Sequence, residues 1–205
     1  MVRIERSIGG DLEANCWIIH HGEGSETFII DPGYNHKTYM AILREAKLKP
    51  KAILLTHHHR DHAGAANVLA GEFDIPVYMH EGDLPYYKGR VDVAFEGGET
   101  LYLKGGNTTG RGEPVALLHT PGHSAGGACF YLPESKVSFT GDTIFNIDLG
   151  YTCFAGGSDK DMRASLINIV NKWGNDITIY PGHGDPATMK YVRTSNKEFI
   201  DIVGE

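Results

Sequence analysis

Short apolar segments alternate with polar turns along the chain, and their spacing predicts a mixture of strands and helices. Residues 14–21 and 27–30 are apolar runs of strand length on either side of a turn at 22–26. Apolar residues then recur at helical spacing, which predicts a helix over 36–47. Further short β-type runs cover residues 51–56, 76–79, 100–103, 115–119, 128–132, 136–140 and 178–180.

The remaining segments predict helices and one long loop. A capping-box-like start at Ser158 is followed by apolar residues on one helix face as far as Trp173. Helices are also predicted over 64–70 and 188–203, and a glycine-rich polar loop over 105–112. Strands and helices mix throughout without a low-complexity linker or an obvious repeat. We therefore expect one layered α/β domain over residues 1–205.

Composition excludes several classes of protein. The longest uninterrupted apolar runs have five residues, whereas a membrane-spanning helix needs roughly twenty. The N-terminus has no apolar stretch of signal-peptide length, so we expect a cytoplasmic protein that does not bind membranes. The net charge is −7 without a run of Lys and Arg, which disfavours nucleic acid as a partner. Three widely spaced cysteines predict reduced thiols rather than disulfides, with Cys16 and Cys129 in the core.

The strongest chemical signal is the sequence Thr-His-His-His-Arg-Asp-His at residues 56–62, directly after a predicted strand. His57 and His59, two residues apart, can converge on one ion, and Asp61 and His62 can face a second. Neutral imidazole and carboxylate are standard zinc ligands. A solvated histidine run or an expression tag is the plain alternative, but a tag would lie at a terminus and lack the aspartate.

Three later segments each place one more candidate ligand beside glycine after a predicted strand. These ligands are His123 in residues 119–124, Asp142 in 139–143 and His183 in 180–184. A lone aspartate after a strand is usually a turn or cap residue. Only the four segments together, in this order, indicate a metal site. We expect His58 and Arg60 to point away from the metals, into core or solvent.

The order T-H-x-H-x-D-H, then H, then G-D-T, then G-H-G, spread over residues 15–183, resembles the metallo-β-lactamase superfamily. The resemblance implies a four-layer αββα sandwich with two divalent metal ions at one edge, between the sheets. Zinc is favoured, and iron or manganese are alternatives. The implied ligands are His57, His59 and His123 for the first ion, Asp61, His62 and His183 for the second, and Asp142 bridging both. Asp31 resembles an aspartate that supports the ligands in this family, or is a plain turn residue before Pro32.

Residues 141–145 and the run Gly156-Gly157-Ser158 most resemble the glyoxalase II-like branch, the hydroxyacylglutathione hydrolases. This implies a metal-dependent hydrolase in which a metal-bound hydroxide attacks a thioester or a related small acyl ester. Asp61 would orient that nucleophile and handle its proton. The alternatives are a persulfide dioxygenase-like oxidoreductase with one iron, held by two histidines and an aspartate, and a lactonase or lactamase of the same superfamily. Acidic charge disfavours a nuclease, and the complete ligand set disfavours a non-catalytic metal-binding module.

Two departures from that branch concern the substrate, which we expect to be a small molecule. Only residues 184–205 follow the last ligand, enough for one helix rather than a helical glutathione-binding domain. The sequence Gly150-Tyr151-Thr152-Cys153 stands where short relatives carry Gly-Arg-Thr-Asp, so that charged pair is absent. Tyr151, Cys153 and Phe154 are therefore candidates to line a less charged pocket, with ordinary loop packing as the alternative.

Overall fold

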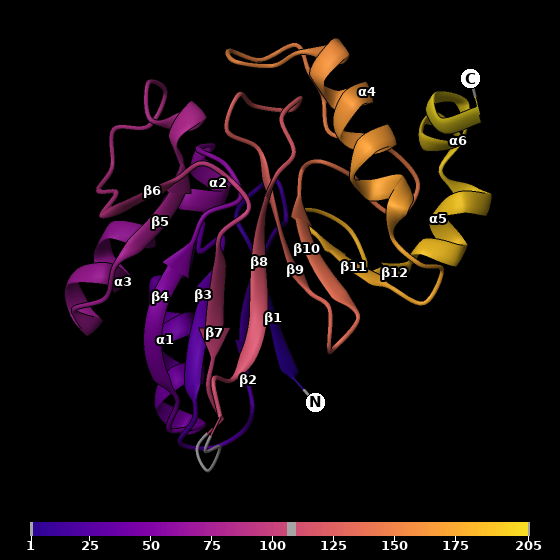
Figure 1. The fold of residues 1–205 in the computed structure, drawn as a ribbon. Helices are drawn as coiled ribbons and strands as arrows, with labels where there is room; N and C mark the ends of the chain where they lie inside the picture. The colour runs from indigo at the N-terminus through magenta and orange to yellow at the C-terminus, as the bar shows by residue number, and fades with distance from the viewer. Residues whose placement is uncertain (1, 106–109, 205) are drawn as a thin grey trace.

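Two six-stranded sheets face each other at the centre of the computed structural model, which describes residues 2–105 and 110–204 (Figure 1). The first sheet has the order β1 (Arg3–Gly9), β2 (Ala14–His20), β3 (Glu26–Ile30), β4 (Lys49–Leu54), β5 (Val77–His80) and β6 (Val93–Phe95). The second has the order β12 (Ala187–Thr188), β11 (Thr178–Pro181), β10 (Val137–Gly141), β9 (Ala128–Leu132), β8 (Glu113–His119) and β7 (Thr100–Leu103).

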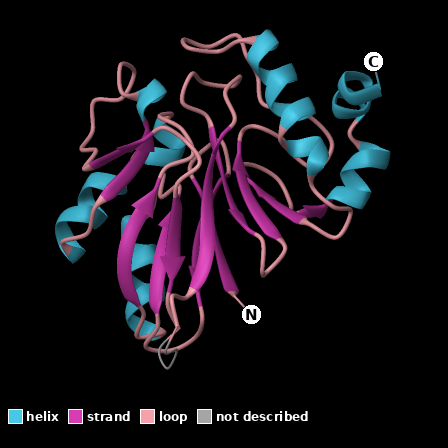
Figure 2. Cartoon of the chain, viewed as in Figure 1, coloured by secondary structure: helices cyan, strands magenta, loops and turns pink. Residues whose placement is uncertain are grey.

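Helices cover the outer face of each sheet, as the cyan and magenta elements of Figure 2 show. The first sheet carries α1 (His36–Glu45) and α3 (Ala66–Phe73), with the single turn α2 (Arg60–Ala63) between them in sequence. The second carries α4 (Asp159–Asn168), α5 (Met189–Ser195) and α6 (Lys197–Gly204). Two 3-10 turns, η1 (Glu81–Asp83) and η2 (Val170–Lys172), complete the described helices. The expected αββα sandwich is confirmed, and none of the described helices is long and apolar enough to cross a membrane.

The strands β2 and β3 of the first sheet are buried along nearly their whole length because both faces of the sheet are covered there. Along β2, Cys16 and Ile18 point into the cluster under α1 and α3, whereas Trp17 and Ile19 point between the sheets. Side chains alternate across a strand, so successive residues of one apolar run reach two different cores. This explains why residues 16–19 of β2 form a continuous apolar run. A third cluster joins the second sheet to α4, α5 and α6.

Two strands at the margins of the first sheet were not predicted. In β1, five of the seven residues are exposed or half-exposed, and three of these, Arg3, Glu5 and Arg6, are charged. An edge strand of this kind presents no apolar run, although all seven of its residues pair with β2. The other missed strand, β6, has only three residues. The glycine-rich loop predicted at 105–112 lies partly outside the described residues.

The C-terminal helix predicted over 188–203 is wrong in one respect, because it is two helices that meet at Asn196. This side chain is fully buried, and its oxygen accepts a hydrogen bond from the backbone N–H of Phe199 in α6. Its amide nitrogen donates to the backbone carbonyls of Phe145 and Asp148, at 3.2 and 2.7 Å. Helical periodicity continues across the junction, so the apolar pattern alone gave no sign of the break.

We expect Asn196→Ala to lower the free energy of unfolding by about 1–3 kcal/mol, because it removes a helix cap and the hydrogen bonds from a buried amide to two loop carbonyls. Urea unfolding at a fixed metal concentration measures this change. Exposed Asn171→Ala is the matched control and should change stability by less than about 0.5 kcal/mol. Equal effects of the two substitutions would contradict the assigned role of Asn196.

Candidate metal centre

The predicted ligands lie at the ends of strands that open onto one edge of the sandwich. His57 follows β4, His123 follows β8, Asp142 follows β10 and His183 follows β11. In the second sheet, β8 and β10 both run antiparallel to β9, and β11 runs parallel to β10. Three of these strands therefore end at the same edge, and short loops are enough to bring their polar residues together.

Hydrogen bonds tie the two sheets together at this edge. The backbone N–H of Ala128 in β9 donates to the carbonyl of Thr56, at 2.9 Å, just before the histidine-rich loop. The backbone N–H of Asn15 in β2 donates to the carbonyl of Gly182, at 2.7 Å, just before His183. The relative positions of the ligand loops are thus set by the backbone of both sheets.

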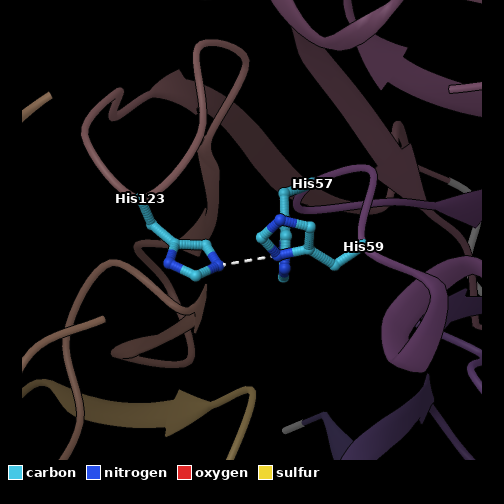
Figure 3. Close-up of side chains that lie close together, drawn as sticks. All are labelled: His57, His59 and His123. Atoms are coloured by element: carbon cyan, nitrogen blue, oxygen red, sulfur yellow. Dashed lines mark hydrogen bonds between the residues drawn. The ribbon is translucent and has the colours of Figure 1, made fainter. Parts of the chain in front are cut away.

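His57, His59 and His123 form the first ligand group, and Figure 3 shows their rings pointing toward one another. One ligand atom from each lies within 4.8 Å of the others. The Nε2 atom of His123 is 2.9 Å from Nδ1 of His59. Nε2 of His57 is buried without a hydrogen-bond partner among the described residues.

Asp61, His62 and His183 form the second ligand group. The Nε2 atoms of the two histidines are 3.1 Å apart, and each is 3.4 Å from Oδ2 of the aspartate. A tetrahedral metal with bonds of about 2.0–2.1 Å holds two nitrogens roughly 3.3 Å apart. The spacing of the imidazole nitrogens in both groups is close to that value.

The carboxylate of Asp142 lies between the two groups. Its Oδ1 is 3.5 Å from Nε2 of His62, and its Oδ2 is 3.5 Å from Nε2 of His123 and 3.6 Å from Nε2 of His183. Oδ1 is buried and has no hydrogen-bond partner among the described residues. A buried acceptor without a hydrogen-bond partner destabilises a folded protein. Nε2 of His57 and Oδ1 of Asp142 are two such atoms beside clustered imidazoles, as expected of residues that bind cations. The seven predicted ligands are thus brought together as two groups joined by one carboxylate.

Three histidine ligands are oriented through the nitrogen that faces away from the site. Nδ1 of His123 donates to the carbonyl of Tyr151 at 2.6 Å, and Nδ1 of His183 donates to the carbonyl of Leu12 at 2.9 Å. Nδ1 of His62 is 3.3 Å from Asp31. A proton held on Nδ1 leaves the Nε2 lone pair free for a metal. Any residue can supply a backbone carbonyl, so the sequence gave no sign that these two would orient the histidines.

Asp31 supports the site rather than forming a plain turn. It is buried, and its carboxylate accepts hydrogen bonds from the backbone N–H and the hydroxyl of Thr56, at 2.7 and 2.5 Å. With the contact to His62, this side chain joins both ends of the 56–62 loop. A nearby group of Asp31, His57 and His62 also has metal-binding dimensions. The hydrogen bonds already made by Asp31 argue for an orienting role instead.

Sequence reasoning missed Asp83 in η1, which joins two ligand loops. Its fully buried carboxylate accepts hydrogen bonds from the backbone N–H of His58 at 2.9 Å and from the hydroxyl of Ser124 at 2.9 Å. It also accepts one from the backbone N–H of Gly126 at 2.6 Å. His58 belongs to neither ligand group; its Nδ1 lies 3.0 Å from Oδ2 of Asp83, and its ring stacks on Tyr86. A single aspartate in a short loop carries no signal that would have identified it.

The three histidines of the first group have lowered pKa values, which favour their neutral form. Burial and the neighbouring imidazoles lower the pKa of His57 well below its usual value and that of His59 to about 4. Burial also lowers the pKa of His123, against the attraction of Asp142. Neutral imidazole is the form that binds a metal.

The two histidines of the second group have raised pKa values instead, because carboxylates surround them. Burial opposes protonation of His62, but Asp142, Asp31 and Asp61 outweigh it and raise its pKa well above the usual value. Burial likewise opposes protonation of His183, and the hydrogen bond to Asp61 with the charge of Asp142 raises its pKa. Against its own burial, Asp61 keeps a pKa well below the usual range because both histidines donate to it.

Glycine is required at two close approaches beside the ligands. A Cβ on Gly33 would lie 1.5 Å from the backbone oxygen of Asp61, and a Cβ on Gly182 would lie 2.2 Å from Oδ1 of Asp142. Real Cβ atoms do not come this close to backbone or carboxylate oxygens, so any larger residue would displace a ligand.

Five of the seven predicted ligands, His59, Asp61, His123, Asp142 and His183, line an open cavity of about 740 Å³. Tyr151 and Phe154, two of the expected pocket residues, line it. Cys153 is exposed and is not among its lining residues, so the expected contact of this side chain with substrate has no support in the structure. Its neighbour Phe154, and Tyr151 two positions earlier, line the cavity instead. Cys16 and Cys129 are buried, as predicted.

Comparison with known proteins agrees with the motifs. The family model described as the Metallo-beta-lactamase superfamily matches residues 9–183. The hydroxyacylglutathione hydrolase GloC of Haemophilus influenzae is 33% identical over 203 residues, which cover 90% of this chain and 92% of GloC.

Two solved structures are also similar over nearly their whole length. The crystal structure of the BLEG-1 B3 metallo-beta-lactamase has a TM-score of 0.87 and 26% identity, with 96% of this chain and 99% of that chain covered. The crystal structure of TTHA1623 in a di-iron-bound form has a TM-score of 0.80 and 31% identity, with 95% and 99% covered. Clustered histidines and aspartates on this fold suit divalent metals such as zinc or iron. The chain therefore belongs to the metallo-β-lactamase superfamily, and its relatives there place it in the general class of metal-dependent hydrolases.

Proposed function

We propose that this protein hydrolyses a thioester, or a related small acyl ester, at a centre of two divalent metal ions. One observation carries the proposal: two groups of ligands face each other across Asp142 beside an open cavity. Such a site combines a place for metals with access for a substrate. Similarity to GloC over 90% of this chain supports a thioester as the bond that is cleaved.

The residues of the chain would divide the work as follows. His57, His59 and His123 would hold one ion, Asp61, His62 and His183 the other, and Asp142 both. Bound divalent ions supply a Lewis acid for the carbonyl oxygen and make water a nucleophile near neutral pH. In the reaction, the oxygen of water bonds to the carbonyl carbon and the carbon–sulfur bond breaks. The products are a carboxylate, a thiol and one released proton, because one hydrogen of water goes to the thiolate and the other to solvent.

Asp61 is the proposed catalytic residue beside the metals. It lines the cavity, and its pKa lies well below the usual range, so it is a carboxylate at neutral pH. A carboxylate with a low pKa is a hydrogen-bond acceptor more than a proton store. Its role would be to orient the attacking water and to pass the proton on toward the departing thiolate.

The wider setting of this activity is also a proposal. A cavity of about 740 Å³ is of the size that small molecules occupy, which supports a small-molecule substrate. Three free cysteines are compatible with a reducing compartment, so we keep the expectation of a cytoplasmic location.

Metal removal and a substrate panel test the function. We expect metal-free protein to lack thioesterase activity and added Zn²⁺, Fe²⁺ or Mn²⁺ to restore it, with about two ions per chain by elemental analysis. The panel includes a lactone and a β-lactam, because a β-lactamase shares this fold. Full activity without metal would contradict the proposal. One iron per chain with oxygen uptake on a persulfide, and no thioester cleavage, would place the chain among dioxygenases instead.

Substitution of ligands should remove metal and turnover together. We expect His59→Ala and Asp142→Ala to bind less metal and to lose about 100-fold or more in kcat/KM, since even residues that only support ligands cost 10–100-fold. His36→Ala, in α1 and outside the ligand groups, is the matched control and should keep both properties. Loss of turnover at unchanged metal content would show that these side chains do not act as ligands.

The two groups should lose metal at different pH values. A raised pKa keeps His62 and His183 protonated up to a higher pH, and an imidazolium cannot bind a metal. A lowered pKa keeps His57 and His59 neutral to a lower pH. On acidification in the presence of a chelator, we therefore expect the ion of the second group to leave first.

Metal content per chain, measured from pH 8 down to about pH 4, would then fall in two steps. His183→Ala should abolish the step at higher pH, and His59→Ala should abolish the step at lower pH. A reversed assignment of the two steps would contradict the argument from the pKa directions.

A further inference from the structure

The cavity above the ligands has an apolar wall that the proposed chemistry does not require. Its apolar lining residues are Leu12, Phe145, Ile147, Tyr151 and Phe154. Four of them are exposed large side chains: Leu12 at 65%, Ile147 at 54%, Tyr151 at 75% and Phe154 at 50%. Exposed apolar side chains gathered around one cavity indicate a binding surface, whereas scattered ones do not.

Hydrogen bonds fix the position of the apolar wall relative to the ligands. The loops that carry Leu12 and Tyr151 also supply the carbonyls that accept from His183 and His123. The same peptide segments therefore orient ligands through their backbone and present apolar side chains to the cavity.

Aromatic rings extend the wall to both ligand groups. The ring of Phe154 lies edge-on to His59 and His123, with centroids 5.4 and 5.9 Å away. The ring of Phe145 lies 6.0 Å from that of His183. A substrate carbonyl at the ligands would thus have hydrocarbon surface on both sides.

The charges around the cavity decide which part of a thioester fits there. Among the described lining residues, Arg60 is the only lysine or arginine, and Asp148 adds a carboxylate besides those of the ligand groups. Biological thiol carriers are anionic, so one cation gives them little to bind. The acyl half of a thioester carries no such charge when it is a hydrocarbon.

We infer that the substrate's acyl group is a hydrocarbon chain of medium length that lies against the wall of Leu12, Phe145, Ile147, Tyr151 and Phe154. This inference rests on the proposed thioesterase function and names its substrate class. The thiol half then extends out of the cavity, and the protein discriminates substrates by acyl chain length rather than by recognition of an anionic carrier.

A series of thioesters with one thiol and acetyl, butyryl, hexanoyl, octanoyl or decanoyl groups tests this. We expect kcat/KM of the metal-loaded protein to rise roughly two- to fourfold per methylene until the chain outgrows the wall. Ile147→Ser should reduce the increase in kcat/KM per methylene, whereas Ile147→Leu should keep an increase close to that of the wild type. Ile167→Ser, on α4 and 44% exposed but outside the cavity, is the matched control and should keep the wild-type rise.

Cleavage of short acyl groups with a flat or falling series would overturn the inference and leave the thioesterase function standing. The inference would also be overturned if kcat/KM increased with the apolar character of the thiol and not with the length of the acyl chain. If Ile147→Ser changes the oligomeric state on size-exclusion chromatography without changing the series, the wall is an interface between copies and the inference fails.

Binding of the acid products separates the two proposals if no thioester is cleaved. We expect the affinity of the metal-loaded protein for carboxylates to rise from acetate to decanoate in calorimetric titrations, and Ile147→Ser to weaken this trend. A chain-length-independent affinity would overturn the acyl inference, whatever the outcome for turnover.

Discussion

The metal centre depends on the hydrogen bonds that hold two separate sheets together at one edge. The first sheet supplies the 56–62 loop, and the second supplies His123, Asp142 and His183. The backbone bonds from Ala128 to Thr56 and from Asn15 to Gly182 connect the two sides next to the ligands. Asp83 adds a side-chain connection between the loops of His58 and Ser124. Without these links, ligands from different sheets would not be held at the spacing that one ion needs.

The residues that would bind metal were predictable because they recur as dense, unusual motifs. Four histidines and an aspartate within six positions have few structural explanations, and the later ligands each stand beside glycine after a strand. The elements of the interior were predictable for a similar reason, since buried strands such as β2 and β3 contain short apolar runs at residues 16–19 and 28–30.

What the sequence did not predict depends on contacts between distant segments. The carbonyls of Leu12 and Tyr151 orient ligands, but any residue has a carbonyl, so their sequence carries no signal. The same holds for Asn196, whose side chain breaks the C-terminal helix by binding carbonyls about fifty positions away. It also holds for β1, an edge strand that is identified by its pairing with β2 and not by its own polarity.

Charge balance explains how the site can exist before metal binds. Asp31, Asp61 and Asp142 bring three carboxylates to a small, largely buried volume, and unpaired buried charges are strongly destabilising. The carboxylates raise the pKa of His62 and His183, so protons on these imidazoles offset part of the negative charge. A divalent ion at the same nitrogens would replace those protons while keeping the charge balanced. Protons can therefore balance the carboxylates of the second group before a metal binds, whereas the first group consists of neutral imidazoles and has no charge to balance.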